Sequence, residues 1–236
     1  LSEQKDVQFN TKILFSNEVP KREDYSTSQL NYTPSHGDTP AFDALFGKLY
    51  LDSELNKILW FIGALLTNNM HKIQKFMYLY GAKGSGKGTV ISLFEKLFEG
   101  YYGHINLARL TSGSEFATSQ IEELPLLIDS DSRINKIKDD TNLLKLTSHE
   151  PISVNKKHKQ IYDVTFDGLL ITASNQRYQV ENIDAGITRR AVVVHPSGKT
   201  HDSETYFKLT KQLEFELPYI AQKAIDHFNS VGPYYY

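Results

Sequence analysis

The sequence predicts an α/β fold in which a central parallel β-sheet is flanked by helices and is preceded by a small N-terminal helical subdomain. Two observations predict this class. Short apolar runs, typical of buried strands, alternate with segments whose apolar residues recur at three- and four-residue steps, as on one face of a helix. One apolar run also leads into a glycine-rich turn and then into a helical pattern, which makes a strand–turn–helix unit.

Composition narrows the classes of function. The absence of cysteine excludes disulfides, thiolate zinc sites and cysteine nucleophiles. No apolar stretch reaches the roughly 18 residues needed to cross a bilayer, so we expect no membrane contact. The formal net charge of −2 counts against a broad basic face, so any contact with nucleic acid must be local.

The chain divides into four predicted segments. Residues 1–40 are polar, are interrupted by Pro20, Pro34 and Pro40, and read as an extended linker. Residues 41–72 form the N-terminal helical subdomain, because leucine and isoleucine recur there with helical spacing. Residues 73–200 form the core, and residues 201–236 form a C-terminal helical segment.

Within the core, each element has a local signal. Apolar runs predict buried strands at residues 76–80, 124–128, 168–174 and 191–195. The pattern at residues 90–98 predicts a helix that stops at Gly100. A charged helical segment is expected up to about residue 147. Residues 152–154 and 161–166 can pair as a hairpin, and residues 203–229 have a helical pattern.

The glycine-rich turn is the leading candidate for a binding site. It comprises Gly81, Ala82, Lys83, Gly84, Ser85, Gly86, Lys87, Gly88 and Thr89. Glycines let the backbone curl so that successive N–H groups and the positive end of the following helix surround phosphate oxygens. We expect Lys87 to reach the β- and γ-phosphates of a nucleotide. A glycine-rich surface turn without function is the alternative.

One position in this turn departs from the usual pattern. The hydroxyl residue that normally follows the lysine is Gly88, and a hydroxyl appears one place later, at Thr89. Either Thr89 binds Mg²⁺ from a displaced position, or water replaces the hydroxyl. A Gly-Lys-Gly-Thr ending is also common in nucleotide monophosphate kinases, so the turn alone leaves that reading open.

Two carboxylates follow the second predicted strand. A carboxylate at the carboxyl end of a parallel strand points into the crevice where ligands bind. Asp129 can hold Mg²⁺, directly or through water, and Asp131 can polarise the attacking water. Ser130 separates the two acids, so the division of roles between them stays open.

Further polar residues flank the last two strands. Asn175 follows the third predicted strand, where a neutral amide can orient water beside a γ-phosphate. Arg189 and Arg190 precede the fourth, where an arginine can be held at a subunit edge and reach the ATP of a neighbour. A turn asparagine and a surface arginine pair are the alternatives.

The order of these elements resembles the superfamily 3 helicases of viruses and phages, in particular the helicase domain of poxvirus- and phage-type primase-helicases. The resemblance covers residues 51–196. Residues 84–89 resemble the first motif of the family, residues 126–131 the second, and residues 143–152 an intermediate motif that leads into a DNA-contacting hairpin. Asn175 stands where the family has its sensor asparagine, and residues 184–190 are similar to the segment with the arginine finger.

The resemblance implies an AAA+ P-loop NTPase that uses ATP and Mg²⁺ in a homo-hexameric ring and moves on single-stranded DNA in genome replication. It implies that Arg190, or as second choice Arg189, is the arginine finger. It places the basic cluster in the central channel, with DNA bound by Lys156, Lys157, His158 and Lys159. A primase or polymerase domain in the same longer polypeptide, and the host cytoplasm as location, are further expectations.

Two other functions remain open on the sequence. A non-enzymatic AAA+ module that loads or scaffolds replication proteins would share the same motifs. A nucleotide monophosphate kinase needs several arginines around the phosphates and a mobile lid. Between residues 89 and 166 the chain has only Arg109 and Arg133, which disfavours the kinase.

Overall fold

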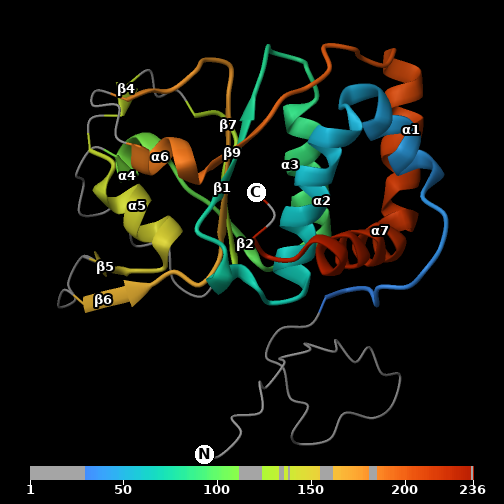
Figure 1. Ribbon diagram of the computed structural model, residues 1–236. Helices are drawn as coiled ribbons and strands as arrows, with labels where there is room; N and C mark the ends of the chain where they lie inside the picture. Colours follow the sequence, from blue (N-terminus) through green and yellow to red (C-terminus); the bar gives the residue numbers. More distant parts are fainter. Residues whose placement is uncertain are drawn as a thin grey trace, which may run out of the picture.

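The computed structural model describes residues 30–111, 124–132, 136–137, 139–154, 162–180, 185–234 and 236 (Figure 1). Most of the predicted linker at residues 1–40 therefore lies outside the described residues. Among the described helices, none combines the length and the apolar character that crossing a membrane requires.

A five-stranded parallel sheet forms the centre of the molecule. Its strands are β1 (Phe76–Tyr80), β2 (Tyr102–His104), β3 (Leu126–Asp129), β7 (Leu169–Ser174) and β9 (Ala191–Val194), in the spatial order β2-β3-β7-β1-β9. Each neighbouring pair is parallel. The four strands predicted from apolar runs are confirmed. The edge strand β2 was not predicted, because its sequence Tyr-Gly-His contains no apolar run.

Helices cover both faces of this sheet, as predicted (Figure 1). One face carries α1 (Pro40–Leu49), α2 (Asp52–Leu66), α3 (Lys87–Leu97) and α7 (Ser203–Val231). The other carries α4 (Leu107–Leu110), α5 (Thr141–Ser148) and α6 (Ala185–Arg190). Burial on both faces explains why the inner strands are continuously apolar rather than alternating.

Short elements complete the described fold. The predicted hairpin is confirmed as the antiparallel pair β5 (Pro151–Val154) and β6 (Tyr162–Thr165). A second small pair joins β4 (Lys136–Ile137) to β8 (Gln179–Val180), and a 3-10 turn, η2 (Met70–Lys72), precedes β1. The charged helical segment expected up to residue 147 is the eight-residue helix α5.

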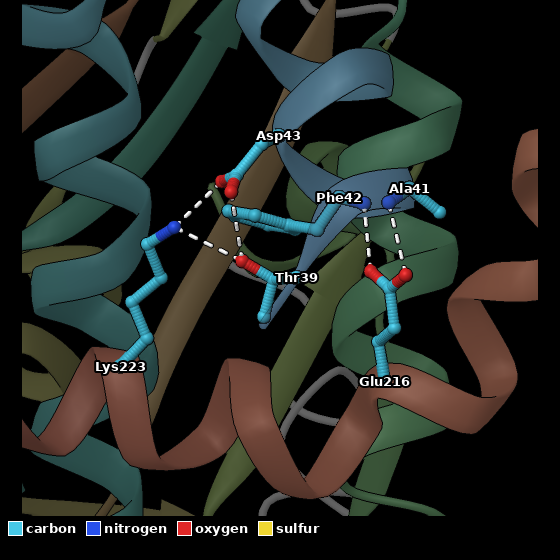
Figure 2. A network of polar contacts seen from close by, with 6 residues as sticks. All are labelled: Thr39, Ala41, Phe42, Asp43, Glu216 and Lys223. Carbon is cyan, nitrogen blue, oxygen red and sulfur yellow. Dashed lines mark hydrogen bonds and ion pairs between the residues drawn. The ribbon is translucent and has the colours of Figure 1, made fainter. Parts of the chain in front are cut away.

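The N-terminal and C-terminal helices share one core with the sheet. Buried side chains of α1, α2 and α7 belong to the same apolar cluster as residues of β1, β3 and β7. Figure 2 shows one polar joint of this assembly: the carboxylate of Glu216 on α7 accepts hydrogen bonds from the backbone N–H groups of Ala41 and Phe42, both at 2.9 Å. The predicted segment boundaries at residues 72 and 200 stay a prediction. In the structure, the helices on the outer side of each boundary pack into one core with the sheet.

Candidate functional site

The carboxyl edge of the sheet gathers most of the predicted site. Because β1, β7 and β3 are neighbours, the segments that follow them open toward the same pocket, which has a volume of about 1010 Å³. Lys87, Asp131 and Asn175 line this pocket together with the glycine-rich turn. Three segments that are separated by about 40 residues or more in the chain thus meet at one place, as expected for ligand sites of parallel sheets.

The glycine-rich turn connects β1 to α3. Gly84 and Gly86 have φ values of +76° and +102°, which residues with a Cβ rarely adopt. Gly86 precedes Lys87, the first residue of α3, so the turn ends at a helix N-terminus. Gly86, Lys87 and Gly88, at this helix N-terminus, line the pocket.

Lys87 is buried at the centre of the site. Its ammonium group donates hydrogen bonds to the carbonyl oxygens of Gly81 and Ala82 and to Oδ1 of Asn175, each at 2.8 Å. These three acceptors use all three hydrogens of the ammonium. Burial lowers the pKa of Lys87, while the negative charge of Asp131 opposes that shift. Lys87 and Asn175, from segments distant in the chain, are therefore in direct contact.

The two acids that the sequence could not separate lie in different surroundings. Asp131 is exposed and lines the pocket. Asp129 is only 7% exposed, and its Oδ2 accepts a hydrogen bond from the backbone N–H of Leu107 at 2.9 Å. Burial raises the pKa of Asp129, and the hydrogen bond from Leu107 opposes the shift. Asp129 therefore anchors the start of α4, and its expected role as a Mg²⁺ ligand stays a prediction.

The hydroxyl of Thr89 lies 3.1 Å from the hydroxyl of Tyr206 on α7. Gly88, where a hydroxyl residue is usual, is exposed, and a Cβ built there meets no atom within 4 Å. Thr89 and Asp131 supply the oxygen ligands that Mg²⁺ prefers, and both line the pocket. Mg²⁺ binding at this pocket stays a prediction.

Sequence reasoning missed the wall of the pocket that α7 provides. Tyr206 and Phe207, in the first turns of this helix, line the pocket, and Phe207 is 63% exposed. The helix was predicted, but no local sequence pattern indicates its contact with the glycine-rich turn, which lies over 100 residues away in the chain. An aromatic pair at the start of a helix is more often part of a core.

The two arginines lie at the other edge of the sheet. They end α6 directly before β9, whose first residue pairs with the first residue of β1. Nη2 of Arg190 donates to Oγ of Ser148 at 2.5 Å, and Lys75 donates to the carbonyl oxygen of Arg189. Neither arginine lines the pocket of its own chain.

The predicted DNA-binding cluster cannot be placed. Lys156, Lys157, His158 and Lys159 lie outside the described residues, between β5 and β6. What the structure supplies is the hairpin that carries them, with four residue pairs from Pro151–Thr165 to Val154–Tyr162.

Comparison with known proteins finds one family model that matches part of the chain and several solved structures that resemble it. A model of a family of unknown function, DUF5906, matches residues 79–190. The comparison with curated proteins found no match. Solved structures of the C-terminal region of NrS-1 without ligand resemble the chain at 18% identity, with TM-scores of 0.63, 0.62 and 0.60.

These structures cover 83% of the chain, and the chain spans 49% or 50% of each of them. At this identity the likeness shows the fold alone. The chain thus has an α/β fold with a central parallel sheet flanked by helices, in common with about half of the NrS-1 C-terminal region.

Proposed function

We propose that this chain is an ATP-dependent DNA helicase or translocase domain of viral or phage replication, which works as a ring of identical copies on single-stranded DNA. The observation that carries the proposal is the joining of the glycine-rich turn, Lys87, Asp131 and Asn175 in one pocket at the carboxyl edge of a parallel sheet. The resemblance to superfamily 3 helicases supports the choice of activity, and the likeness to NrS-1 supports a place within a longer protein.

The proposed chemistry is hydrolysis of the terminal phosphate. Phosphate oxygens bind the backbone N–H groups before Lys87, and the ammonium of Lys87 exchanges its carbonyl acceptors for β- and γ-phosphate oxygens. Water then attacks the γ-phosphorus, the bond to the bridging oxygen breaks, and ADP leaves with inorganic phosphate.

Asp131 and Asn175 act on the attacking water in this proposal. Both line the pocket beside Lys87, where a carboxylate can accept a hydrogen bond from water and an amide can orient it. Thr89 and Asp131 would hold Mg²⁺, which neutralises charge that develops on the phosphate oxygens. Thr89 has to release Tyr206 to serve in this way.

The arginines can only act on a second copy. Since Arg190 lies at the amino edge of the sheet and the pocket at the carboxyl edge, Arg190 of one chain reaches a nucleotide only across a boundary between copies. An arginine supplied in trans stabilises transition-state charge and accelerates hydrolysis by about 10³–10⁵ in other systems. A ring of copies meets this requirement.

The proposal is tested by phosphate release from MgATP, with and without single-stranded DNA, alongside the molar mass in solution. We expect hydrolysis that single-stranded DNA stimulates, and we expect Lys87→Ala to reduce it strongly. Lys211→Ala, which removes an exposed lysine of α7 outside the pocket, is the matched control. Stimulation by AMP instead of DNA would indicate a kinase.

A loading or scaffolding module remains the second candidate. Such a module would share the glycine-rich turn and the other motifs without depending on ATP hydrolysis. A scaffold would keep its replication function in the Lys87→Ala variant, whereas a motor would lose it.

A further inference from the structure

One wall of the pocket is aromatic and belongs to α7. Tyr206 and Phe207, in the first turns of this helix, line the same pocket as Lys87 and the glycine-rich turn. Phe207 is 63% exposed, whereas Phe215, which is 80% exposed on the same helix, does not line the pocket. An exposed apolar ring at the wall of a pocket offers a contact to an apolar part of a ligand.

Contacts with two other helices hold the start of α7 in place. Nε2 of His201, just before the helix, lies 3.3 Å from the carbonyl oxygen of Leu45 on α1. The hydroxyl of Tyr206 lies 3.1 Å from the hydroxyl of Thr89 on α3. The ring of Phe207 packs edge-on against that of Tyr206, with centroids 6.0 Å apart and an interplanar angle of 72°. Phe207 therefore stands on a segment that is tied to the rest of the pocket.

The pocket has room for more than a chain of phosphates. Its volume of about 1010 Å³ lies at the upper end of the range for pockets that enclose whole small-molecule ligands, roughly 300–1000 Å³. Phosphates need N–H groups and a cation, which the glycine-rich turn and Lys87 supply. The aromatic wall supplies neither, so it suits a different part of the ligand, namely a flat ring.

A nucleobase is a flat ring that is joined to phosphates. It stacks on aromatic side chains through its π face, and this contact requires no particular pattern of donors and acceptors. Thr200, His201 and Ser203, which precede the aromatic pair in the chain, also line the pocket. Their hydroxyl and imidazole groups can meet the polar edge of a base, so the lining at the start of α7 combines a stacking face with polar groups.

We propose that Phe207 binds the base of a nucleotide, which stacks on its ring while the phosphates bind at the glycine-rich turn. The inference rests on the proposed function for the place of the phosphates, and it adds a place for the base. It makes the ligand a nucleotide rather than an inorganic polyphosphate, because a polyphosphate has no ring to stack on Phe207.

The first measurement is a calorimetric titration with ATP and with inorganic tripolyphosphate, both with Mg²⁺. Phe207→Ala should weaken ATP binding about tenfold, as loss of one base–aromatic stack implies, and should leave tripolyphosphate binding unchanged. Phe215→Ala, which removes an exposed phenylalanine of the same helix outside the pocket, is the control and should change neither. Unchanged ATP binding in Phe207→Ala, or equal weakening of both ligands, would overturn the inference.

The second measurement keeps an aromatic face at this position and makes it visible. In Phe207→Trp, saturable quenching of tryptophan fluorescence is expected on addition of MgATP and not on addition of tripolyphosphate. The one natural tryptophan, Trp60, is fully buried and does not line the pocket. Phe215→Trp, the control, should respond to neither ligand. Quenching that follows protein concentration and not nucleotide would assign Phe207 to a contact between copies, and would contradict the inference.

Both measurements record binding, whereas the proposed function is tested by phosphate release, so the two can fail separately. If ATP binds through Phe207 but is not hydrolysed, the place of the base holds and the proposed motor function is wrong. If ATP is hydrolysed while Phe207→Ala binds it as tightly as the unmodified chain does, the function holds and this inference is wrong.

Discussion

Lys87 is the residue on which the candidate site depends most. Its ammonium lies among two backbone carbonyls and the Asn175 amide, so the positive charge is fixed beside the turn rather than free in solvent. Under the proposed function, phosphate oxygens replace the carbonyl acceptors of this ammonium, and the positive charge already lies beside the turn when they arrive.

We expect Lys87→Ala to reduce ATP hydrolysis by about 100-fold to 1000-fold, the loss typical when one preorganised donor is removed. Steady-state phosphate release measures the effect, and circular dichroism checks that the fold persists. Activity within a few-fold of the unmodified chain would show that Lys87 does not contact the reacting phosphates.

Substitutions of Asp131 and Asp129 should have different effects, one on hydrolysis and the other on stability. Asp131→Asn is expected to lower metal-dependent hydrolysis about 100-fold with an unchanged free energy of unfolding, and a chelator should abolish hydrolysis in the unmodified chain. Asp129→Ala is expected to cost about 1–3 kcal/mol of stability, because it leaves the Leu107 N–H without its acceptor.

Denaturant unfolding and phosphate release, measured on both variants, test this division. If Asp131→Asn is fully active while Asp129→Ala is inactive and as stable as the unmodified chain, the reacting acid is Asp129.

Two glycines of the turn provide a matched pair for stability. Gly86→Ala should destabilise the fold by about 1–2 kcal/mol, since φ is +102° and a Cβ would meet Leu49 at 3.2 Å. Gly88→Ala lies in the first turn of α3 with open space around it, and it should be neutral or stabilising. Urea unfolding of both variants distinguishes them, and equal losses would contradict the described backbone of the turn.

At the scale of elements, α7 links the pocket to the N-terminal helices. Its first turns contact Thr89, and its middle positions α1 through Glu216 (Figure 2). Further along α7, Lys223 donates to Asp43 at 2.6 Å and to Thr39 at 3.0 Å. One helix therefore contacts both the pocket and α1.

Glu216→Ala should reduce the free energy of unfolding by about 2–3 kcal/mol, because a buried carboxylate that accepts two backbone N–H bonds is lost. Thermal or urea unfolding gives the measurement. Glu214→Ala, an exposed glutamate on the same helix, is the control and should have a much smaller effect. Equal losses would show that Glu216 does not secure α1.

The elements themselves were largely predictable from the sequence, and their contacts were not. Strands β1, β3, β7 and β9 are apolar runs because both faces of the sheet are covered, and burial leaves a local pattern. The burial of Asp129 under α4 and the contribution of Tyr206 leave no such pattern, since both depend on segments distant in the chain. The sequence placed Lys87, Asp131 and Asn175 in the segments that follow predicted strands, and the adjacency of β3, β7 and β1 brings these segments together.

At the scale of the whole molecule, the proposed nucleotide site and the proposed arginine finger lie at opposite edges of the sheet. The pocket lies at the carboxyl edge and Arg190 at the amino edge. One copy therefore cannot complete its own site by means of Arg190, and the account requires assembly for full activity.

Mixing two inactive variants tests this requirement. Lys87→Ala and Arg190→Ala should each hydrolyse ATP poorly alone, and a mixture should regain part of the activity. In mixed rings, some pockets combine an intact Lys87 from one copy with an intact Arg190 from its neighbour. Mixtures with no more activity than the sum of the two variants would exclude a role for Arg190 across copies.

The central claim is that a nucleoside triphosphate binds at the turn before Lys87. The most direct measurement is a titration of MgATP while the backbone amide resonances of the chain are recorded by NMR. The account predicts that Gly84, Gly86 and Lys87 shift most, and that Lys87→Ala weakens the response. Saturable shifts confined to other parts of the molecule, with the turn unaffected, would contradict it.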